Sequence, residues 1–346
     1  MTTWKTVPIS ECHEPLVALG PFSRYSHIAG SPIYAGAGTD SPYYPHGLPH
    51  ALFTHFVREG VAWRLDHASK NLPPRIIFYP WDCFRKLETQ QAIFDHHADG
   101  LRRDNPGWDE ERILVRAQRL VSLPSRDPRK PSPHNTGGAV DITLAQLPVA
   151  RWIEWKGLTL LISRAWQQDS QFLNWKVLYL FHMRVMDVVR RYSTLLSMGS
   201  RFDEACPVTE SNYYKLHLPQ NRAEKIIARN RELLRRVLET VGFRRYAEEW
   251  WHFNLGNQMW AEDAHAPYAY YGAACFSEEN QQWEAMRRNH HARQAVWHQG
   301  EEIDVQSGGK LGFTPEMIYE AIHFAKRWAH AFSKPSFTLH PQAAIL

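Results

Sequence analysis

The chain has 346 residues, of which 44% are hydrophobic and 22% are charged, and its formal net charge is +4. This balance is ordinary for a globular protein and excludes a chain that is disordered throughout. The small net charge argues for no particular partner, because nucleic-acid binding needs a concentrated basic stripe. No run approaches the ~20 apolar residues that a membrane span needs, so we expect neither nucleic acid nor a membrane as a partner.

The beginning of the chain and its cysteines suggest a compartment. The first residues, MTTWKTVPISECHE, contain no apolar core of a signal peptide. The four cysteines are widely spaced and form no C-x-x-C pair: Cys12, Cys83, Cys206 and Cys275. This pattern is typical neither of a zinc cluster nor of a disulfide framework. We therefore expect a soluble protein of the reducing cytoplasm.

The first third of the chain alternates between irregular and regular segments. Residues 20–50 are rich in Gly, Pro, Ser and Tyr, which predicts a long irregular segment. Apolar residues at helical spacing then predict a helix over about 50–69. A short apolar run after two prolines predicts a strand over 75–79, and helical patterns follow over about 88–101 and 109–121.

The remaining elements mix strands and helices without regular βαβ alternation, which favours an α+β fold. After a loop over 124–133, residues 139–144 alternate as a strand does. The apolar stretch 158–194 predicts one or two buried helices. Residues 221–241 form an amphipathic helical pattern, and we interpret its arginines as a solvated face. A strand is expected over 249–255.

The stretch PSPHNTGGAVDITL, residues 131–144, holds the first candidate metal ligands. Asp141 lies within an apolar alternating run, where an unpaired carboxylate is costly to bury. A glycine pair between His134 and Asp141 lets the backbone fold back, so that both side chains can meet at one ion. Ser132 is placed for a hydrogen bond to the site or to a substrate. The alternative is an ordinary turn, in which Asp141 caps a loop and His134 is exposed.

A second stretch, EEWWHF over residues 248–253, can complete a catalytic site. Catalytic zinc sites use three N or O ligands and leave one position to water, and His252 offers the third ligand. Glu249 can then act as a general base on that water. Residues three apart point to opposite faces of a regular strand, so the backbone must bend between them. The alternative is an exposed glutamate that precedes a buried aromatic strand.

A third motif, WDCFR over residues 81–85, directly follows the first predicted strand. Arg85 at its end could stabilise the oxyanion of a tetrahedral intermediate. From this motif alone, a surface arginine or a structural ion pair with Asp82 is the simpler interpretation.

Taken together, the motifs resemble one family. Ser-x-His-x(6)-Asp followed by Glu-x-x-His is similar to the pattern of zinc D-alanyl-D-alanine dipeptidases of the vancomycin-resistance type. These enzymes are relatives of bacterial D,D-carboxypeptidases and of the hedgehog signalling domain. WDCFR resembles the family's W-D-x-[YF]-R segment, and LLSMGSRFDE resembles its M-G-[ST]-x-F-D segment. The resemblance extends over about residues 4–275, in the family's order.

The resemblance implies a hedgehog/D,D-peptidase-like fold, with a central, mostly antiparallel sheet flanked by helices, and one zinc ion per chain. It implies hydrolysis of a small dipeptide, with D-Ala-D-Ala as the first candidate. A related hydrolase for another dipeptide or amide, and a zinc-stabilised scaffold without activity, are the alternatives. The implied roles are zinc ligand for His134, Asp141 and His252, general base for Glu249, carbonyl polarisation for Arg85, ammonium binding for Asp203, and substrate contact for Ser132 and Tyr25.

The chain departs from compact family members in two places. A helix-like aromatic segment is inserted at about 146–194, and further residues follow the family's usual end. We therefore predict a catalytic domain over 1–275, which includes this insert, and a partly helical extension over 276–346. Either addition could form the interface of a homo-oligomer.

Overall fold

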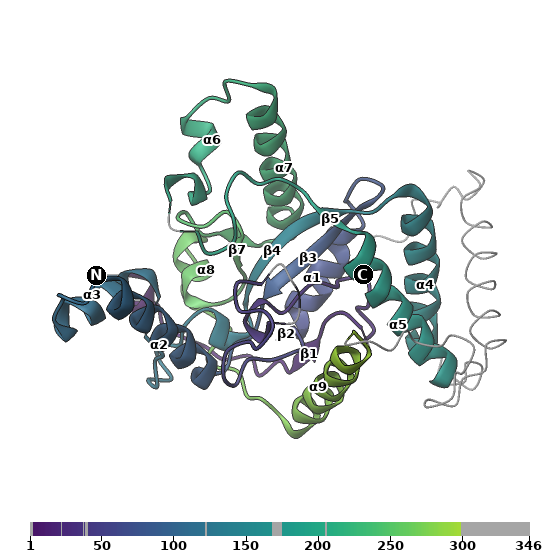
Figure 1. Ribbon diagram of the computed structural model, residues 1–346, viewed down its shortest axis with the longest axis horizontal. Helices are drawn as coiled ribbons and strands as arrows, with labels where there is room; N and C mark the ends of the chain where they lie inside the picture. Colours follow the sequence, from purple (N-terminus) through teal and green to yellow (C-terminus); the bar gives the residue numbers. More distant parts are fainter. Residues whose placement is uncertain are drawn as a thin grey trace.

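The computed structural model describes residues 3–298, apart from residues 22, 37, 39–40, 122, 168–174 and 205. At its centre lies an antiparallel sheet flanked by helices (Figure 1), which confirms the predicted fold class. The strands of this sheet, in spatial order, are β3 (Ile76–Asp82), β4 (Ala139–Gln146), β7 (His252–Asn254) and β6 (Arg244–Arg245), with β5 (Thr194–Leu195) also paired to β4. A separate two-stranded sheet consists of β1 (Leu16–Ala18) and β2 (Phe56–Arg58).

Helices cover the sheet and extend beyond both of its ends (Figure 1). Among the described residues the α-helices are α1 (Glu59–Ser69), α2 (Leu87–Asp104), α3 (Glu110–Leu120), α4 (Val149–Gln167), α5 (Trp175–Tyr192), α6 (Tyr213–Leu216), α7 (Arg222–Glu239), α8 (Gln258–Asp263) and α9 (Glu278–His298). The short 3-10 helices are η1 (Thr3–Thr6), η2 (Ile33–Ala35), η3 (His134–Thr136) and η4 (Pro207–Thr209). Within this described part, every helix is too short or too polar to cross a bilayer.

Strand β4 is the central strand and carries the geometry of the site. It pairs with β3 along one edge and with β7 and β5 along the other, so both of its edges are hydrogen-bonded. Its Val140, Ile142 and Leu144 lie in the main hydrophobic core, which explains why its sequence is so apolar. Asp141 lies directly opposite His252 in the register with β7. This pairing brings together two residues that are far apart in the sequence.

The predicted strands and helices are found with changes of boundary, such as α4, which begins at Val149 rather than at 158. The helix predicted over 50–69 begins only at Glu59, because Phe56–Arg58 pair with β1 as strand β2 instead. The strand predicted over 249–255 is shorter, because residues 250–251 form a turn before β7. The backbone N–H of His252 donates to the carbonyl of Glu249 at 3.3 Å, which confirms the bend predicted between these residues.

The predicted insert consists of the two helices α4 and α5, which pack against each other at one end of the sheet (Figure 1). Buried Glu154 of α4 accepts hydrogen bonds from Arg184 of α5 at 2.6 Å and from Arg151 at 2.8 Å. Phe181, Val185 and other apolar side chains of α5 lie in the main core. The insert is thus part of the same hydrophobic core as the sheet.

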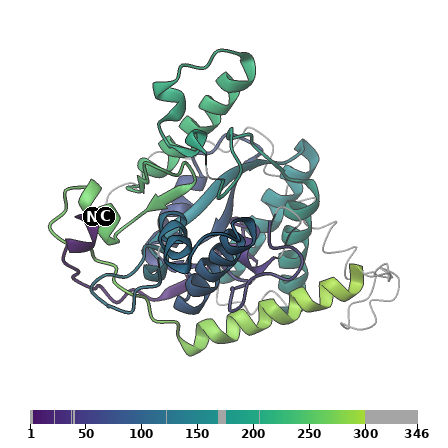
Figure 2. The ribbon, with the colours of Figure 1, turned by 60° about the vertical axis from the view of Figure 1, so that its left-hand side comes forward.

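The first part of the predicted extension is held tightly to the rest of the chain. Helix α9 runs along one side of the molecule (Figure 2), and the carboxylate of its Glu284 accepts the backbone N–H groups of Phe53 and Thr54 at 2.9–3.1 Å. Just before α9, the ring of Phe276 stacks on Phe84 with centroids 5.7 Å apart. The prediction of an extension up to residue 346 lies outside the described residues from 299 onwards.

Candidate metal centre

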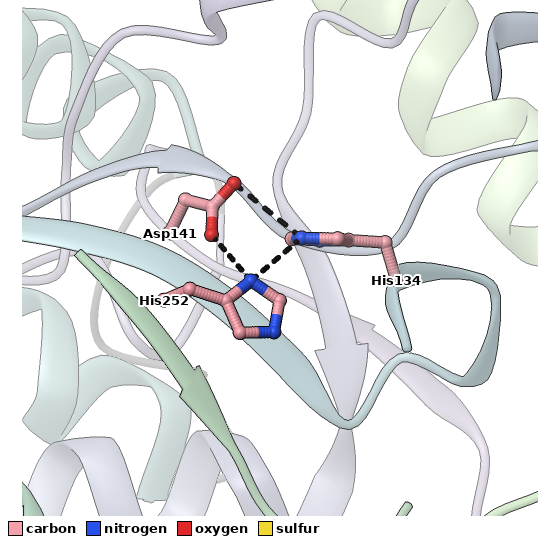
Figure 3. A group of neighbouring side chains, drawn as sticks. All are labelled: His134, Asp141 and His252. Carbon is pink, nitrogen blue, oxygen red and sulfur yellow. Dashed lines mark hydrogen bonds and ion pairs between the residues drawn. The ribbon is translucent and has the colours of Figure 1, made fainter. Parts of the chain in front are cut away.

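Three buried side chains converge near the N-terminal end of β4. The nearest nitrogen of His134, the carboxylate of Asp141 and the nearest nitrogen of His252 all lie within 4.8 Å of one another (Figure 3). His252 Nδ1 lies 2.9 Å from Asp141 Oδ1 and 3.3 Å from His134 Nε2, and His134 Nε2 lies 3.4 Å from Asp141 Oδ2. Two imidazole nitrogens and one carboxylate oxygen are a donor set that zinc takes in catalytic sites. The structure therefore brings together the three predicted ligands in an arrangement that fits one cation.

The glycine pair lets η3 carry His134 to this point. Gly137 has φ +70°, in the left-handed region that favours glycine, and ends η3 there. A Cβ atom at Gly138 would lie 2.4 Å from the carbonyl oxygen of Leu255, which follows β7. The two glycines thus allow the chain to turn sharply and to enter β4 close against its neighbour.

In each histidine, the ring nitrogen that points away from the centre is hydrogen-bonded, which leaves the nitrogen that points into the centre free to bind a metal ion. His134 Nδ1 lies 2.7 Å from the carbonyl oxygen of Cys83, so this nitrogen donates and Nε2 keeps its lone pair. His252 Nε2 donates to Asn254 Oδ1 at 3.1 Å, which leaves the lone pair of Nδ1. Asn254 Oδ1 also accepts a hydrogen bond from Asn257 Nδ2 at 2.7 Å, which orients the amide. Such partners fix the tautomer of metal-binding histidines.

Replacement of Asn254 by leucine should therefore weaken metal binding. We expect the affinity for zinc to fall by about 10–100-fold, the usual effect of losing an outer hydrogen bond to a histidine ligand. Competition with a chromophoric chelator measures this affinity. The matched control is Asn280→Leu, which removes a buried asparagine of α9 whose Nδ2 donates to the carbonyl of Leu16 in β1. Equal zinc affinity in both variants would contradict the assignment of Asn254.

Opposite charges shift the pKa values of Asp141 and His134. Burial alone would raise the pKa of Asp141, but His134 and His252 hold that pKa well below its ordinary value through charge and hydrogen bonds. Burial alone would lower the pKa of His134, but Asp141 and Asp82 raise it above its ordinary value. A cation bound between these groups would take the place of a proton.

Glu249 lies beside the three ligands but is not one of the group. Its carboxylate oxygen Oε2 is 3.8 Å from His252 Nδ1, and its side chain is 36% exposed towards the cavity. Burial of the carboxyl, together with the charges of Asp141 and Asp203, outweighs His252 and raises the pKa of Glu249 to about 7. The two tryptophans that follow it are buried and anchor the turn. A carboxyl group with this pKa can take up and release a proton near neutral pH.

Arg85 is buried and held in place by three partners. Its Nε donates to Asp82 Oδ2 at 2.9 Å, its Nη1 to Gln90 Oε1 at 2.6 Å and its Nη2 to the hydroxyl of Tyr34 at 3.4 Å. Burial opposes its charge, but Asp82 more than offsets that effect and raises the pKa of Arg85. The ion pair with Asp82 that the motif suggested is therefore present, and the guanidinium lies in the wall of the same cavity as the three ligands.

The centre opens into a cavity of about 210 Å³ whose wall includes most of the predicted site. Its lining includes Tyr34, Arg85, Gln90, Ser132, His134, Asp141, Asp203, Glu249, Trp251 and His252. Asp203 faces this space with an exposed side chain, and its φ of 60° is unusual for a residue other than glycine. Desolvation of its carboxyl, together with the charges of Asp141 and Asp82, raises its pKa, although His97 and Arg85 oppose this shift.

Of two residues predicted to contact the substrate, one lines the cavity and the other does not. Ser132 lines the cavity and donates its hydroxyl to Asn135 Oδ1 at 2.7 Å. Tyr25 is not among the described residues that line the cavity; its hydroxyl accepts a hydrogen bond from Arg24. The pocket tyrosine is instead Tyr34, whose hydroxyl lies 3.5 Å from Asp203 Oδ2 and whose ring packs 4.7 Å from the guanidinium of Arg85. Tyr34 lies in the irregular segment, where no periodicity distinguishes one tyrosine from another.

The geometry of the site and the comparison with known proteins indicate the same class of protein, a metallopeptidase. An antiparallel sheet that carries a two-histidine, one-carboxylate centre beside a glutamate is the arrangement of a metallopeptidase. Residues 186–270 match the family model described as D-ala-D-ala dipeptidase, a range that includes Asp203, Glu249 and His252. A curated D-alanyl-D-alanine dipeptidase of Synechocystis sp. (strain ATCC 27184 / PCC 6803 / Kazusa) is 27% identical over 286 residues, which cover 77% of this chain and 94% of that protein. Over these ranges the chain is similar to D-alanyl-D-alanine dipeptidases, and this similarity supports a hydrolase.

Proposed function

We propose that the chain binds one zinc ion through His134, Asp141 and His252 and hydrolyses the peptide bond of a small dipeptide, with D-Ala-D-Ala as the first candidate. The observation that carries this proposal is the convergence of the three donor atoms within 4.8 Å of one another, in the wall of the cavity that also contains Glu249 and Arg85. Zinc, when bound, lowers the pKa of a water ligand and polarises a carbonyl group. The residues of the chain supply the remaining chemistry.

Glu249 is proposed to be the general base. It takes a proton from the attacking water and delivers that proton to the nitrogen of the leaving amine as the peptide bond breaks. Its position 3.8 Å from His252 Nδ1 and its pKa of about 7 support both steps, because the same carboxyl group must be ionised first and protonated afterwards.

Arg85 is proposed to polarise the scissile carbonyl and to hold the oxyanion that forms from it. Its bonds to Asp82, Gln90 and Tyr34 fix the guanidinium before the substrate arrives, so that little reorganisation is needed in the transition state. Lysine would keep the charge but could not maintain these three bonds in one plane.

We therefore expect Arg85→Lys to lose about 10²–10³-fold in kcat while it keeps its bound metal, the usual effect of removing one oxyanion donor. Steady-state kinetics together with metal analysis checks this. The control is Arg112→Lys, since Arg112 also packs on an aromatic ring, that of Trp108, but lies on α3 and is not in the described wall of the cavity. An Arg85→Lys enzyme with the kcat of the control would exclude the oxyanion role.

Asp203 and Ser132 are proposed to bind the substrate. The carboxylate of Asp203 would pair with the free ammonium group of the dipeptide, and an N-blocked chain would leave that acid without a partner. Ser132, which lines the same cavity, would also contact the substrate. In place of the predicted Tyr25, we propose that Tyr34 contacts the substrate, because its hydroxyl lies between Arg85 and Asp203.

A panel of dipeptides tests the substrate class. We expect release of free alanine from D-Ala-D-Ala, and little release from L-Ala-L-Ala or from N-acetyl-D-Ala-D-Ala. Another dipeptide or amide remains the second candidate substrate, because the relative covers only 77% of this chain and the insert α4–α5 adds a structure of its own. Preferential cleavage of another dipeptide in the panel would favour that candidate and overturn D-Ala-D-Ala. A panel without any cleavage would favour the zinc-stabilised scaffold.

The proposal also covers the domain limits, the oligomeric state and the cellular location of the chain. We propose that residues 1–275 carry the catalytic machinery and that residues 276–346 are an extension to it. A homo-oligomer could form through the insert, where Val149 and Trp166 of α4 are exposed, and light scattering on the full chain measures this. A cytoplasmic location is supported by four cysteines that are all free, and cell fractionation tests it.

A further inference from the structure

The basic helix α7 contains one arginine that does not face solvent. Arg231 is only 7% exposed, although the pattern of 221–241 predicted that its arginines form a solvated face. Its Nε donates to the carbonyl oxygen of Met198 at 2.7 Å, its Nη1 to that of Glu210 at 3.0 Å and its Nη2 to that of Val208 at 2.6 Å. A buried cation that bonds only to neutral carbonyls costs free energy, so its place in the fold needs a reason.

The three carbonyls bracket the loop that carries Asp203. Met198 precedes Asp203 in the chain, and Val208 and Glu210 follow it, so the guanidinium of Arg231 joins both ends of the loop. At the tip, Asp203 adopts a left-handed backbone with φ 60°. This conformation is uncommon for residues other than glycine, although aspartate tolerates it better than most, so its surroundings help to hold it. Closure of the loop at its base by Arg231 is one such constraint.

The same loop is bonded to the segment of the general base. The backbone N–H of Trp250, the residue after Glu249, donates to the carbonyl of Thr209 at 2.9 Å, and Trp250 Nε1 donates to Ser200 Oγ at 2.8 Å. The guanidinium of Arg231 lies 5.5 Å from the centroid of the Trp250 ring. Arg231 therefore contacts both the loop of Asp203 and the segment of Glu249.

We propose that Arg231 is a positioning residue that holds the carboxylate of Asp203 at a fixed place relative to Glu249 and thereby sets the recognition of the substrate's ammonium group. The inference rests on the proposed function, in which Asp203 pairs with that group. A planar guanidinium can bond to three carbonyls at once, whereas a lysine ammonium presents a single point charge. A displacement of about 1 Å at a substrate-positioning group can cost about 100-fold in rate.

The test compares Arg231→Lys and Arg231→Gln with the unchanged enzyme, using the full metal-loaded chain. The substrate is D-Ala-D-Ala, and the probe is propionyl-D-alanine, which has the same shape but no ammonium group and is measured by its inhibition constant. We expect the KM for D-Ala-D-Ala to rise by about tenfold or more. The inhibition constant of propionyl-D-alanine stays within about twofold, because it never depended on Asp203. Arg235→Gln on the same helix, which removes a partly exposed arginine paired with Glu232 and Glu239, is the control that should leave both constants unchanged.

Asp203→Asn, alone and combined with Arg231→Gln, separates the two levels of the proposal. If Arg231 acts through Asp203, its substitution adds little to KM once Asp203 is replaced. If Asp203→Asn alone leaves KM unchanged, the ammonium role fails, and the inference fails with it. If Asp203→Asn raises KM but both Arg231 variants only lower the melting temperature or the active fraction, Arg231 is merely structural and the inference alone is overturned.

Discussion

Replacement of Glu249 by glutamine should leave the metal content unchanged and lower kcat for D-Ala-D-Ala by about 10²–10⁴-fold, the usual contribution of a general base. Glutamine has nearly the same shape but cannot accept a proton. Glu249 lies beside the three converging donor atoms without being one of them, so metal binding should not depend on it. Steady-state kinetics and metal analysis on the same preparation measure both quantities.

The neighbouring acid offers the matched control for this variant. Glu248→Gln changes the same residue type one position earlier in the chain, and we expect it to keep most of the activity. Turnover in Glu249→Gln equal to that of Glu248→Gln would exclude Glu249 as the base. Loss of the metal in Glu249→Gln would instead show that Glu249 is a ligand.

Replacement of Asp141 by asparagine should abolish both metal binding and turnover. The asparagine side chain fits the same space but lacks the negative charge that balances a divalent cation between two neutral histidines. Asp141 is also the one carboxylate of the converging group, and it bonds to His252 at 2.9 Å. We expect zinc affinity to fall by more than the ~100-fold expected at most for an outer hydrogen bond such as that of Asn254.

Metal analysis after dialysis, with circular dichroism to show that the chain is folded, measures this effect. The control is Asp127→Asn, which changes a partly exposed loop aspartate paired with Arg129. Retention of stoichiometric zinc by folded Asp141→Asn would rule out the proposed ligand set.

Local patterns in the sequence were sufficient for the fold class and for the elements that carry the site. The apolar alternation around Asp141 predicted β4, and the Glu-x-x-His spacing predicted the turn that the structure has before β7. The helix predicted from residue 50 was wrong over residues 50–58, of which residues 56–58 form strand β2. This strand pairs with β1, and strand pairing between distant segments has no local signature.

Contacts between distant segments explain what was missed in the site. Tyr34 reaches the cavity because η2 packs near β3, a contact that nothing in the irregular segment indicates. The role of Asn254 was missed because the sequence does not show which nitrogen of His252 carries the proton, and it is Asn254 that accepts a hydrogen bond from that nitrogen. Arg231 has the spacing of an exposed helical residue, and only the loop folded over α7 makes it buried. For Tyr34 and Arg231, a partner far away in the sequence determines the role.

The most direct test of a single-zinc dipeptidase is a titration of the metal-free full chain with zinc, followed by the release of D-alanine from D-Ala-D-Ala. Our interpretation predicts no release in the presence of a chelator, activity that rises linearly with added zinc, and a plateau at one zinc ion per chain. Undiminished release from the fully chelated chain, or a folded chain that binds one zinc ion yet releases no D-alanine, would contradict it.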